Sequence, residues 1–201
     1  IGPFDVLNLN SFQDLAFPTG DQTGTLVEAS KPVVVFSGAQ RASVPYNLKD
    51  YSPKPPEPSG EYDSCCTEHF EQQMFPITSL GKVFAITRTP IRSTSGTTEP
   101  DFYRILATKD KTKITTNLTN YPSFSLDKGQ QANFWSIKDF TVESDQPIMI
   151  AQYAVSQGFV DSGGVGDPEF VVFPPVEQYR KDYIFLTPTT FTKDYVIIGA
   201  P

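Results

Sequence analysis

The stretch Val142–Ile150, which reads VESDQPIMI, has the same pattern as Val27–Val35, which reads VEASKPVVV. Each copy begins with valine and glutamate, passes through a short polar segment that ends in Pro32 or Pro147, and continues into an apolar run. A polar turn between two strand-like runs is typical of a hairpin or a corner. The pattern therefore predicts two copies of one strand-turn-strand unit, that is, an internal repeat.

The likeness between the two halves continues downstream with a smaller offset. Residues 76–86 parallel residues 175–185, and Asp101–Tyr103 parallels Asp194–Val196. The change of offset places an insertion in the first copy, between Gln40 and Met74.

We therefore expect two related β lobes. The first covers residues 1–120 and carries the insertion at 40–74, where prolines crowd into an extended loop. The second covers residues 121–201, and we expect it to be truncated at its C-terminal side because it lacks a counterpart of the 113–118 run.

Composition supports an all-β fold. The chain has 18 prolines, 16 phenylalanines and nine tyrosines among 201 residues, and such residues favour strands and turns over long helices. Runs with strand character, separated by Gly, Pro, Asn, Asp and Ser, predict a β-sandwich. These runs are Leu26–Ser37, Lys82–Thr87, Phe102–Thr108, Lys113–Leu118, Phe134–Val142, Pro147–Val155, Phe170–Phe173, Tyr183–Leu186 and Tyr195–Ile198. The best candidate for a helix is the short stretch Cys66–Met74.

Charge and hydropathy exclude two classes of partner. The formal net charge is −7, which would repel phosphate backbones and anionic lipid headgroups, so we expect no nucleic-acid partner. No apolar run approaches the roughly 20 residues of a spanning helix, so we expect no membrane insertion.

Five motifs resemble a known family. They are VVVFSG at 33–38, CTEHFEQQMFP at 66–76, LGK at 80–82, GDP at 166–168 and PPVEQY at 174–179. In this order, and over most of the chain from about Thr25, they resemble the N-terminal domain of the IgG Fc-binding protein family, which is also found in large exported bacterial proteins.

The resemblance implies an extracellular or cell-surface, β-rich module of a larger polypeptide, with adhesion or ligand binding as its role and no catalytic residues. The expected partner is a protein or glycan ligand, besides neighbouring domains of the same polypeptide. The family often carries a further cysteine where this chain has Ala42. Cys65 and Cys66 are therefore left free, bonded to each other or bonded to a cysteine elsewhere.

Cys65, Cys66, Glu68 and His69 gather thiols, a carboxylate and the only histidine within five residues. Zinc needs about four ligands in a tetrahedral array, and a Cys–His nucleophile needs spatial adjacency and an orienting group. We favour the interpretation that a packed or disulfide-tied segment anchors the loop here. A hydrolase that uses His69 or the acidic loop described next is the weaker alternative.

Asp161, Asp167 and Glu169 surround a glycine-rich segment. Oxygen ligands on a flexible loop can bind calcium, but the spacing matches neither the EF-hand nor the nonapeptide calcium repeat. We expect no cofactor and keep calcium as the alternative at these three residues.

Tyr46, Tyr51 and Tyr62 lie in the proline-rich insertion. Tyrosines on loops present a large contact area at low entropic cost, so they are our candidate ligand-binding residues. The competing interpretation is that they fold back and cover an edge of the sandwich. The function that the sequence favours is thus an extracellular adhesion or binding module, and the first alternative is a structural spacer without a ligand of its own.

Overall fold

A computed structural model describes residues 2–11, 20–45, 47–57, 66–94, 96–160, 166–187, 189–190 and 194–200. The described part of the chain is all-β, with four single-turn 3-10 helices and no longer helix. The strands are β1 Phe36–Ala42, β2 Glu68–Gln73, β3 Gly81–Ile86, β4 Asp101–Ala107, β5 Thr112–Thr116, β6 Ser123–Leu126, β7 Gln131–Ser136, β8 Phe140–Ala154 and β9 Glu169–Val172. The 3-10 helices are η1 Leu48–Asp50, η2 Ile77–Ser79, η3 Gln157–Phe159 and η4 Val176–Gln178.

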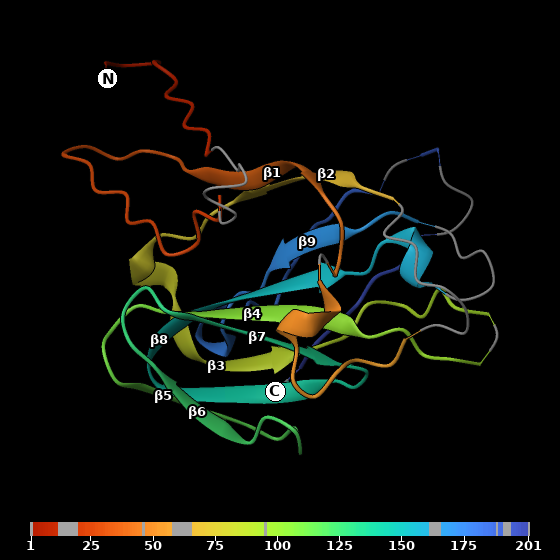
Figure 1. Ribbon diagram of the computed structural model, residues 1–201. Coiled ribbons are helices and arrows are strands. Elements are labelled where there is room, and N and C mark those ends of the chain that lie inside the picture. The colour runs from red at the N-terminus through yellow and green to blue at the C-terminus, as the bar shows by residue number, and fades with distance from the viewer. Residues whose placement is uncertain are drawn as a thin grey trace.

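The long strand β8 organises the fold, because four other strands, β3, β4, β5 and β9, pair with it (Figure 1). Its first half lies between β3 and β5, since Val142 pairs with Phe84 and with Thr116. Its second half lies between β4 and β9, since Ala151 pairs with Arg104 and with Val172. Strand β6 extends the first half beyond β5, and β7 extends the second half beyond β4.

The main core forms where inward-facing side chains of these strands meet. Alternate residues of β8 point the same way, so Val142, Ile148 and Ile150 are all fully buried on one face. They pack with apolar side chains of β3, β4, β5 and β7, among which Tyr103 and Phe134 stack with ring centroids 5.5 Å apart. This alternation gives the sandwich that the sequence predicts.

A second apolar cluster lies on the opposite face of the β4–β8–β9 region. It contains Phe102, Val155, Phe159 and Phe70, with Tyr153 packed against them. Strands β1 and β2 form a separate two-stranded sheet, which lies over this face as an outer layer (Figure 1). This outer layer carries part of the predicted insertion, because β2 and the end of β1 lie within residues 40–74.

The polar segment before Pro147 lies within β8 and does not form a turn between two strands. Opposite β3, the pairing jumps from Glu143↔Val83 to Ile148↔Gly81, so β8 carries extra residues in a bulge at this point. Proline, which has no N–H to donate, is tolerated at such an irregularity. The counterpart Val27–Val35 has no assigned strand, and its residues are exposed except for half-buried Val35.

The two-lobe division is not confirmed. Strands on either side of residue 120 are hydrogen-bonded neighbours in one sheet, for example β5 and β8, or β4 and β7. The stretch 134–142 also spans two strands, because β7 ends at Ser136 and β8 begins at Phe140.

The expected helix at Cys66–Met74 is wrong, because Glu68–Gln73 forms β2 and pairs with β1. Its side chains alternate, with Phe70 buried between exposed His69 and Glu71. Packing of Phe70 into the second cluster overrides the modest helix propensity of the glutamates and glutamines. The runs 183–186 and 195–198 are exposed and have no assigned strand. The predicted run from Leu26 likewise has no assigned strand before β1 begins at Phe36.

Candidate functional site

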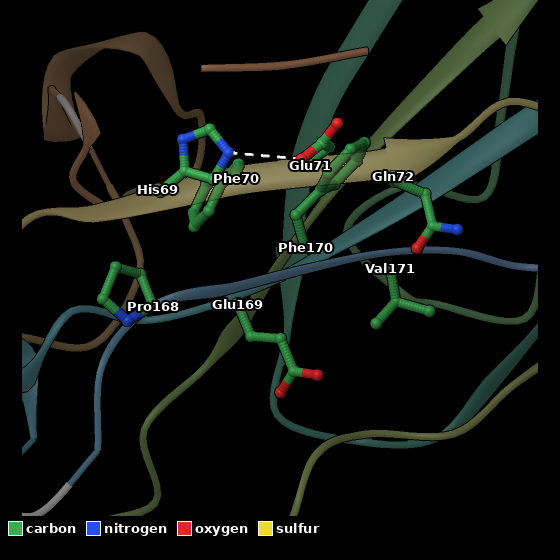
Figure 2. Close-up of a pocket in the computed structure, with 8 residues that line it drawn as sticks. All are labelled: His69, Phe70, Glu71, Gln72, Pro168, Glu169, Phe170 and Val171. Atoms are coloured by element: carbon green, nitrogen blue, oxygen red, sulfur yellow. Dashed lines mark ion pairs between the residues drawn. The ribbon is translucent and has the colours of Figure 1, made fainter. Parts of the chain in front are cut away.

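A groove with a volume of about 340 Å³ lies between β2 and β9 (Figure 2). These two strands approach each other but belong to different strand pairs, since β2 pairs with β1 and β9 pairs with β8. The groove is lined by His69, Phe70, Glu71, Gln72, Pro168, Glu169, Phe170 and Val171. It is therefore formed by two segments that are about 100 residues apart in the sequence.

Aromatic rings form the packed side of the groove. Phe70 stacks on Phe170 with centroids 6.0 Å apart, and Phe170 stacks on Tyr153 with centroids 5.0 Å apart and an interplanar angle of 14°. Such pairs are worth about 0.5–1.5 kcal/mol beyond the area they bury. The stack fixes the spacing of β2 and β9 and so gives the groove a stable base.

The polar side of the groove carries ionisable groups that remain accessible. His69 Nε2 lies 3.5 Å from Glu71 Oε2, and each side chain is 59% exposed. The two residues are two apart on β2, so they share its outer face. Glu169 of β9 also lines the groove and gives it a second carboxylate. The arrangement offers an imidazole and two carboxylates at the rim of an aromatic surface.

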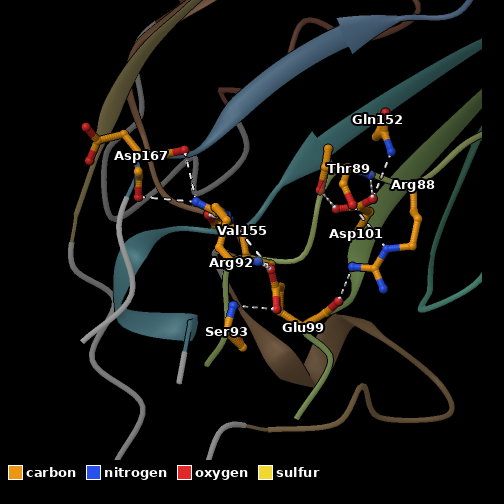
Figure 3. Close-up of polar contacts among 10 residues, drawn as sticks. Arg88, Thr89, Arg92, Ser93, Glu99, Asp101, Gln152, Val155 and Asp167 are labelled. Carbon is orange, nitrogen blue, oxygen red and sulfur yellow. Dashed lines mark hydrogen bonds and ion pairs between the residues drawn. The ribbon is translucent and has the colours of Figure 1, made fainter. Parts of the chain in front are cut away.

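Arg92 links the segment that precedes β9 to Val155, which follows the end of β8 (Figure 3). Its Nη2 donates to the backbone oxygen of Val155 over 2.6 Å, and its Nη1 donates to the backbone oxygens of Gly166 and Asp167 over 3.2 and 3.4 Å. Burial lowers the pKa of Arg92, while Glu99 opposes this effect. The arginine thus positions the segment that leads into Glu169.

Glu99 balances this buried cation. Its carboxylate accepts hydrogen bonds from the backbone N–H groups of Arg92 and Ser93 over 2.5 and 3.2 Å, and Oε1 lies 4.0 Å from Arg92 Nε. Burial raises the pKa of Glu99, but these donors outweigh it, so the pKa lies below its ordinary value. The pair therefore has a structural role beside the groove.

A second buried carboxylate lies at the start of β4. Asp101 accepts hydrogen bonds from the N–H and hydroxyl of Thr89, both over 2.6 Å, and from Nε2 of Gln152 over 2.9 Å. Burial raises the pKa of Asp101, and the hydrogen bonds from Thr89 oppose this shift. Because Asp101 is fully buried and has these partners, it fixes the loop before β4 and does not face a ligand.

Of the three candidate tyrosines, only Tyr51 lies within the described residues; Tyr46 and Tyr62 lie outside them. Tyr51 packs edge-on against Phe102 with centroids 4.7 Å apart, and burial raises its pKa to about 12. Next to it, Trp135 Nε1 donates to the backbone oxygen of Pro53 over 2.7 Å. These contacts support the interpretation that the insertion folds back over the sheet at Tyr51.

Of the candidate calcium ligands, Asp167 and Glu169 are described and Asp161 is not. The backbone oxygens of Gly166 and Asp167 accept hydrogen bonds from Arg92, so a cationic group already occupies part of this segment. Within the described ranges, no three His, Cys, Asp or Glu residues come together as a metal site. Calcium binding at this loop therefore stays the untested alternative to the expectation of no cofactor.

Cys66 is part of a disulfide, while Cys65 lies outside the described residues. The Cys66 sulfur lies 3.7 Å from Oε1 of Gln157 in η3. A disulfide sulfur has no hydrogen to donate, so this approach is a packing contact. It places the cysteine segment against the second cluster.

The groove brings His69 together with carboxylates, which is the juxtaposition that the hydrolase alternative requires. The exposure of His69 and Glu71 nevertheless differs from the desolvated setting in which catalytic acids and bases are tuned. The groove lining also includes no serine, threonine, cysteine or lysine that could act as a nucleophile.

Sequence reasoning did not find the groove as a site, because it assigned Cys66–Met74 to a helix. The available signal was the alternation of polar and apolar residues through Glu68–Gln73, which predicts a half-buried strand. The partnership of Phe70 with Phe170 depends on tertiary packing and has no local signal.

Comparison with known proteins gives one match. A family described as IgGFc binding protein matches residues 2–201, essentially the whole chain, which confirms the resemblance of the five motifs. No curated protein and no solved structure matches the chain. Within the described part of the chain, no helix has the length and apolar character to cross a membrane.

Proposed function

Because the chain belongs to the IgGFc binding protein family, we propose that it is an extracellular module that binds a protein ligand through the groove between β2 and β9. The Fc part of IgG is the first ligand to test, since the family is named for it. The observation that carries the proposal is the placement of exposed His69, Glu71 and Glu169 along an aromatic base.

The chemistry of the groove favours a partner with a basic or amide-bearing segment. Two carboxylates line the groove in a chain whose formal net charge is −7, so complementary charge would accelerate and orient the encounter. Phe170 is only half-buried at the base of the groove and offers apolar contact area, and interfaces gain most from such aromatic groups.

The proposal is tested by measuring the affinity of the chain for Fc with calorimetry or surface plasmon resonance. A double variant, Glu71→Gln and Glu169→Gln, keeps the side-chain volume and removes both charges. We expect it to weaken binding by about tenfold to a hundredfold, because each close charge pair at an interface contributes on the order of 1 kcal/mol or more.

Glu57→Gln is the matched control, since Glu57 is an exposed glutamate outside the groove. Equal loss of affinity in the control and the double variant would contradict a role of the groove. Repeating the titration with deglycosylated Fc distinguishes a protein contact from a glycan contact. Absence of binding to Fc and to glycans would favour the structural-spacer alternative.

A further inference from the structure

Two strand pairs of this fold share one register. In β1–β2, Phe36 pairs with Gln73 and Ala39 pairs with Phe70. In β8–β9, Ala151 pairs with Val172 and Ala154 pairs with Glu169. The β8 residues lie 115 positions after their counterparts in β1, and the β9 residues lie 99 positions after their counterparts in β2. These are the offsets at which the two halves of the sequence match.

The correspondence continues after each pair. Pro76 precedes η2 and Pro175 precedes η4, again 99 positions apart. Both prolines have extended backbone, with φ −64° and ψ 151° at Pro76 and φ −71° and ψ 158° at Pro175. The two segments therefore follow the same path through strand pair, proline and 3-10 helix.

Beyond the 3-10 helices, the two copies differ in their partners. The strands that follow η2 are β3 and β4, which lie on the two sides of β8, since Ile148 pairs with both Gly81 and Ala107. The counterparts after η4 are residues 180–185 and 194–200, which have no assigned strand. Their apolar side chains are open to solvent, with Ile184 fully exposed and Ile198 84% exposed.

In the first copy, β3 and β4 pair with β8. The residues that match this part of β8 in the repeat are 25–38. Residues 26–35 have no assigned strand, and their apolar side chains are exposed, with Val27 at 55% and Val34 at 63%. Residues 36–38 pair with β2 on one edge only, so the edge that corresponds to the β4 side of β8 has no strand partner among the described residues.

We propose that residues 180–185 and 194–200 of one molecule pair with residues 25–38 of a second copy of this chain. In this contact, the two segments pair with residues 25–38 as β3 and β4 pair with β8. The register is taken from those strands, so Tyr183 should lie opposite Val27, and Val196 should lie opposite Ser37. Because the two surfaces are different and lie on the same molecule, the association is head-to-tail. Exposed strand-like segments of this kind readily accept another strand.

The side-chain geometry of the β4–β8 pairing identifies two positions at which the proposed contact can be tested by cross-linking. Ser37 corresponds to Gln152 and Val196 corresponds to Tyr103, and the side chains of Gln152 and Tyr103 meet in a hydrogen bond of 3.2 Å. Their Cβ atoms therefore lie on the same face of adjacent strands. Cysteines at Ser37 and Val196 of two molecules should come within disulfide distance.

The test mixes two single variants of the full chain, Ser37→Cys and Val196→Cys, under mild oxidation. We expect a disulfide-linked heterodimer. Mixing Ser37→Cys with Ile197→Cys is the register control, because the side chain of the neighbouring residue points to the other face. Equal yields from the two mixtures, or no heterodimer in either, would overturn the proposal.

A second measurement does not depend on cysteine chemistry. Sedimentation velocity of the unmodified chain should show species that grow with concentration, and Ile198→Lys should reduce it to a monomer with an unchanged circular dichroism spectrum. A chain that stays monomeric throughout the concentration series would contradict the head-to-tail contact, whatever the result of the Fc titration.

Discussion

Phe70 of β2 stacks on Phe170 of β9 with ring centroids 6.0 Å apart, although the two strands belong to different hydrogen-bonded pairs. The contact joins the outer two-stranded layer to the main sheet and forms the base of the groove. The stability of the outer layer and the shape of the proposed binding groove therefore depend on the same pair of rings.

The stack predicts a large cost for removing Phe70. Because Phe70 is only 7% exposed, Phe70→Ala should lower the free energy of unfolding by about 3–5 kcal/mol through lost burial and a residual cavity. Phe36→Ala in the adjacent strand is the control, since Phe36 is 55% exposed and should cost much less. Urea unfolding measures both variants, and similar costs would refute the assignment of Phe70 to the core.

Arg92 is expected to be indispensable for the segment that leads into β9. Arg92→Met removes the donors to Val155, Gly166 and Asp167 and leaves buried Glu99 without its cation. Breaking such a pair from one side costs about 3–5 kcal/mol. Arg41→Met should change the unfolding free energy by less than about 0.5 kcal/mol, because the Arg41 contact to Thr67 is exposed. A marginal effect of Arg92→Met in thermal or urea unfolding would contradict this role.

The lowered pKa of Glu99 predicts a specific pH dependence. A carboxylate whose folded-state pKa lies below its unfolded value of about 4.5 stabilises the fold above that value, and the stabilisation disappears as pH falls through the folded-state pKa. Glu99→Gln should therefore cost about 1–3 kcal/mol at neutral pH, as expected for hydrogen bonds to a charged group. The difference between parent and variant should close in acid. A difference that is constant from neutral to acidic pH would show that Glu99 contributes by shape alone.

The segment around Asp167 predicts little response to calcium. Since Arg92 donates to the backbone oxygens of Gly166 and Asp167, those oxygens are not available to an ion unless the arginine moves. We expect the same melting temperature in calcium and in EDTA. A rise with calcium that Asp167→Asn abolishes would instead assign the ion to this loop, since a ligand that prefers the native state stabilises it.

Local patterns were enough to predict the all-β class and most strands of the main sheet, although no predicted run covers β6. Runs such as Lys82–Thr87 and Phe102–Thr108 lie within one residue of β3 and β4, because alternation and β-branched or aromatic residues decide strand formation there. The family also followed from five short motifs, which the match over residues 2–201 confirms.

The groove could not be predicted because it depends on contacts between distant segments. Its base needs Phe70 and Phe170 to meet, and nothing near either residue in the sequence specifies the other. The repeat was visible as a pattern around Pro32 and Pro147, but the pattern does not say which strand pairs with which. In the fold, β3 and β4 pair with β8 and not with the matching residues 26–35 that precede them.

The central claim is that the module recognises a protein ligand between β2 and β9, and hydrogen–deuterium exchange with and without Fc tests it most directly. Bound Fc should slow exchange in peptides that contain residues 68–72 and 168–171, because a ligand seated in the groove shields both strands. Peptides around Tyr51 should exchange at the same rate in both states. Slowed exchange around Tyr51 with no change at β2 and β9 would contradict the claim.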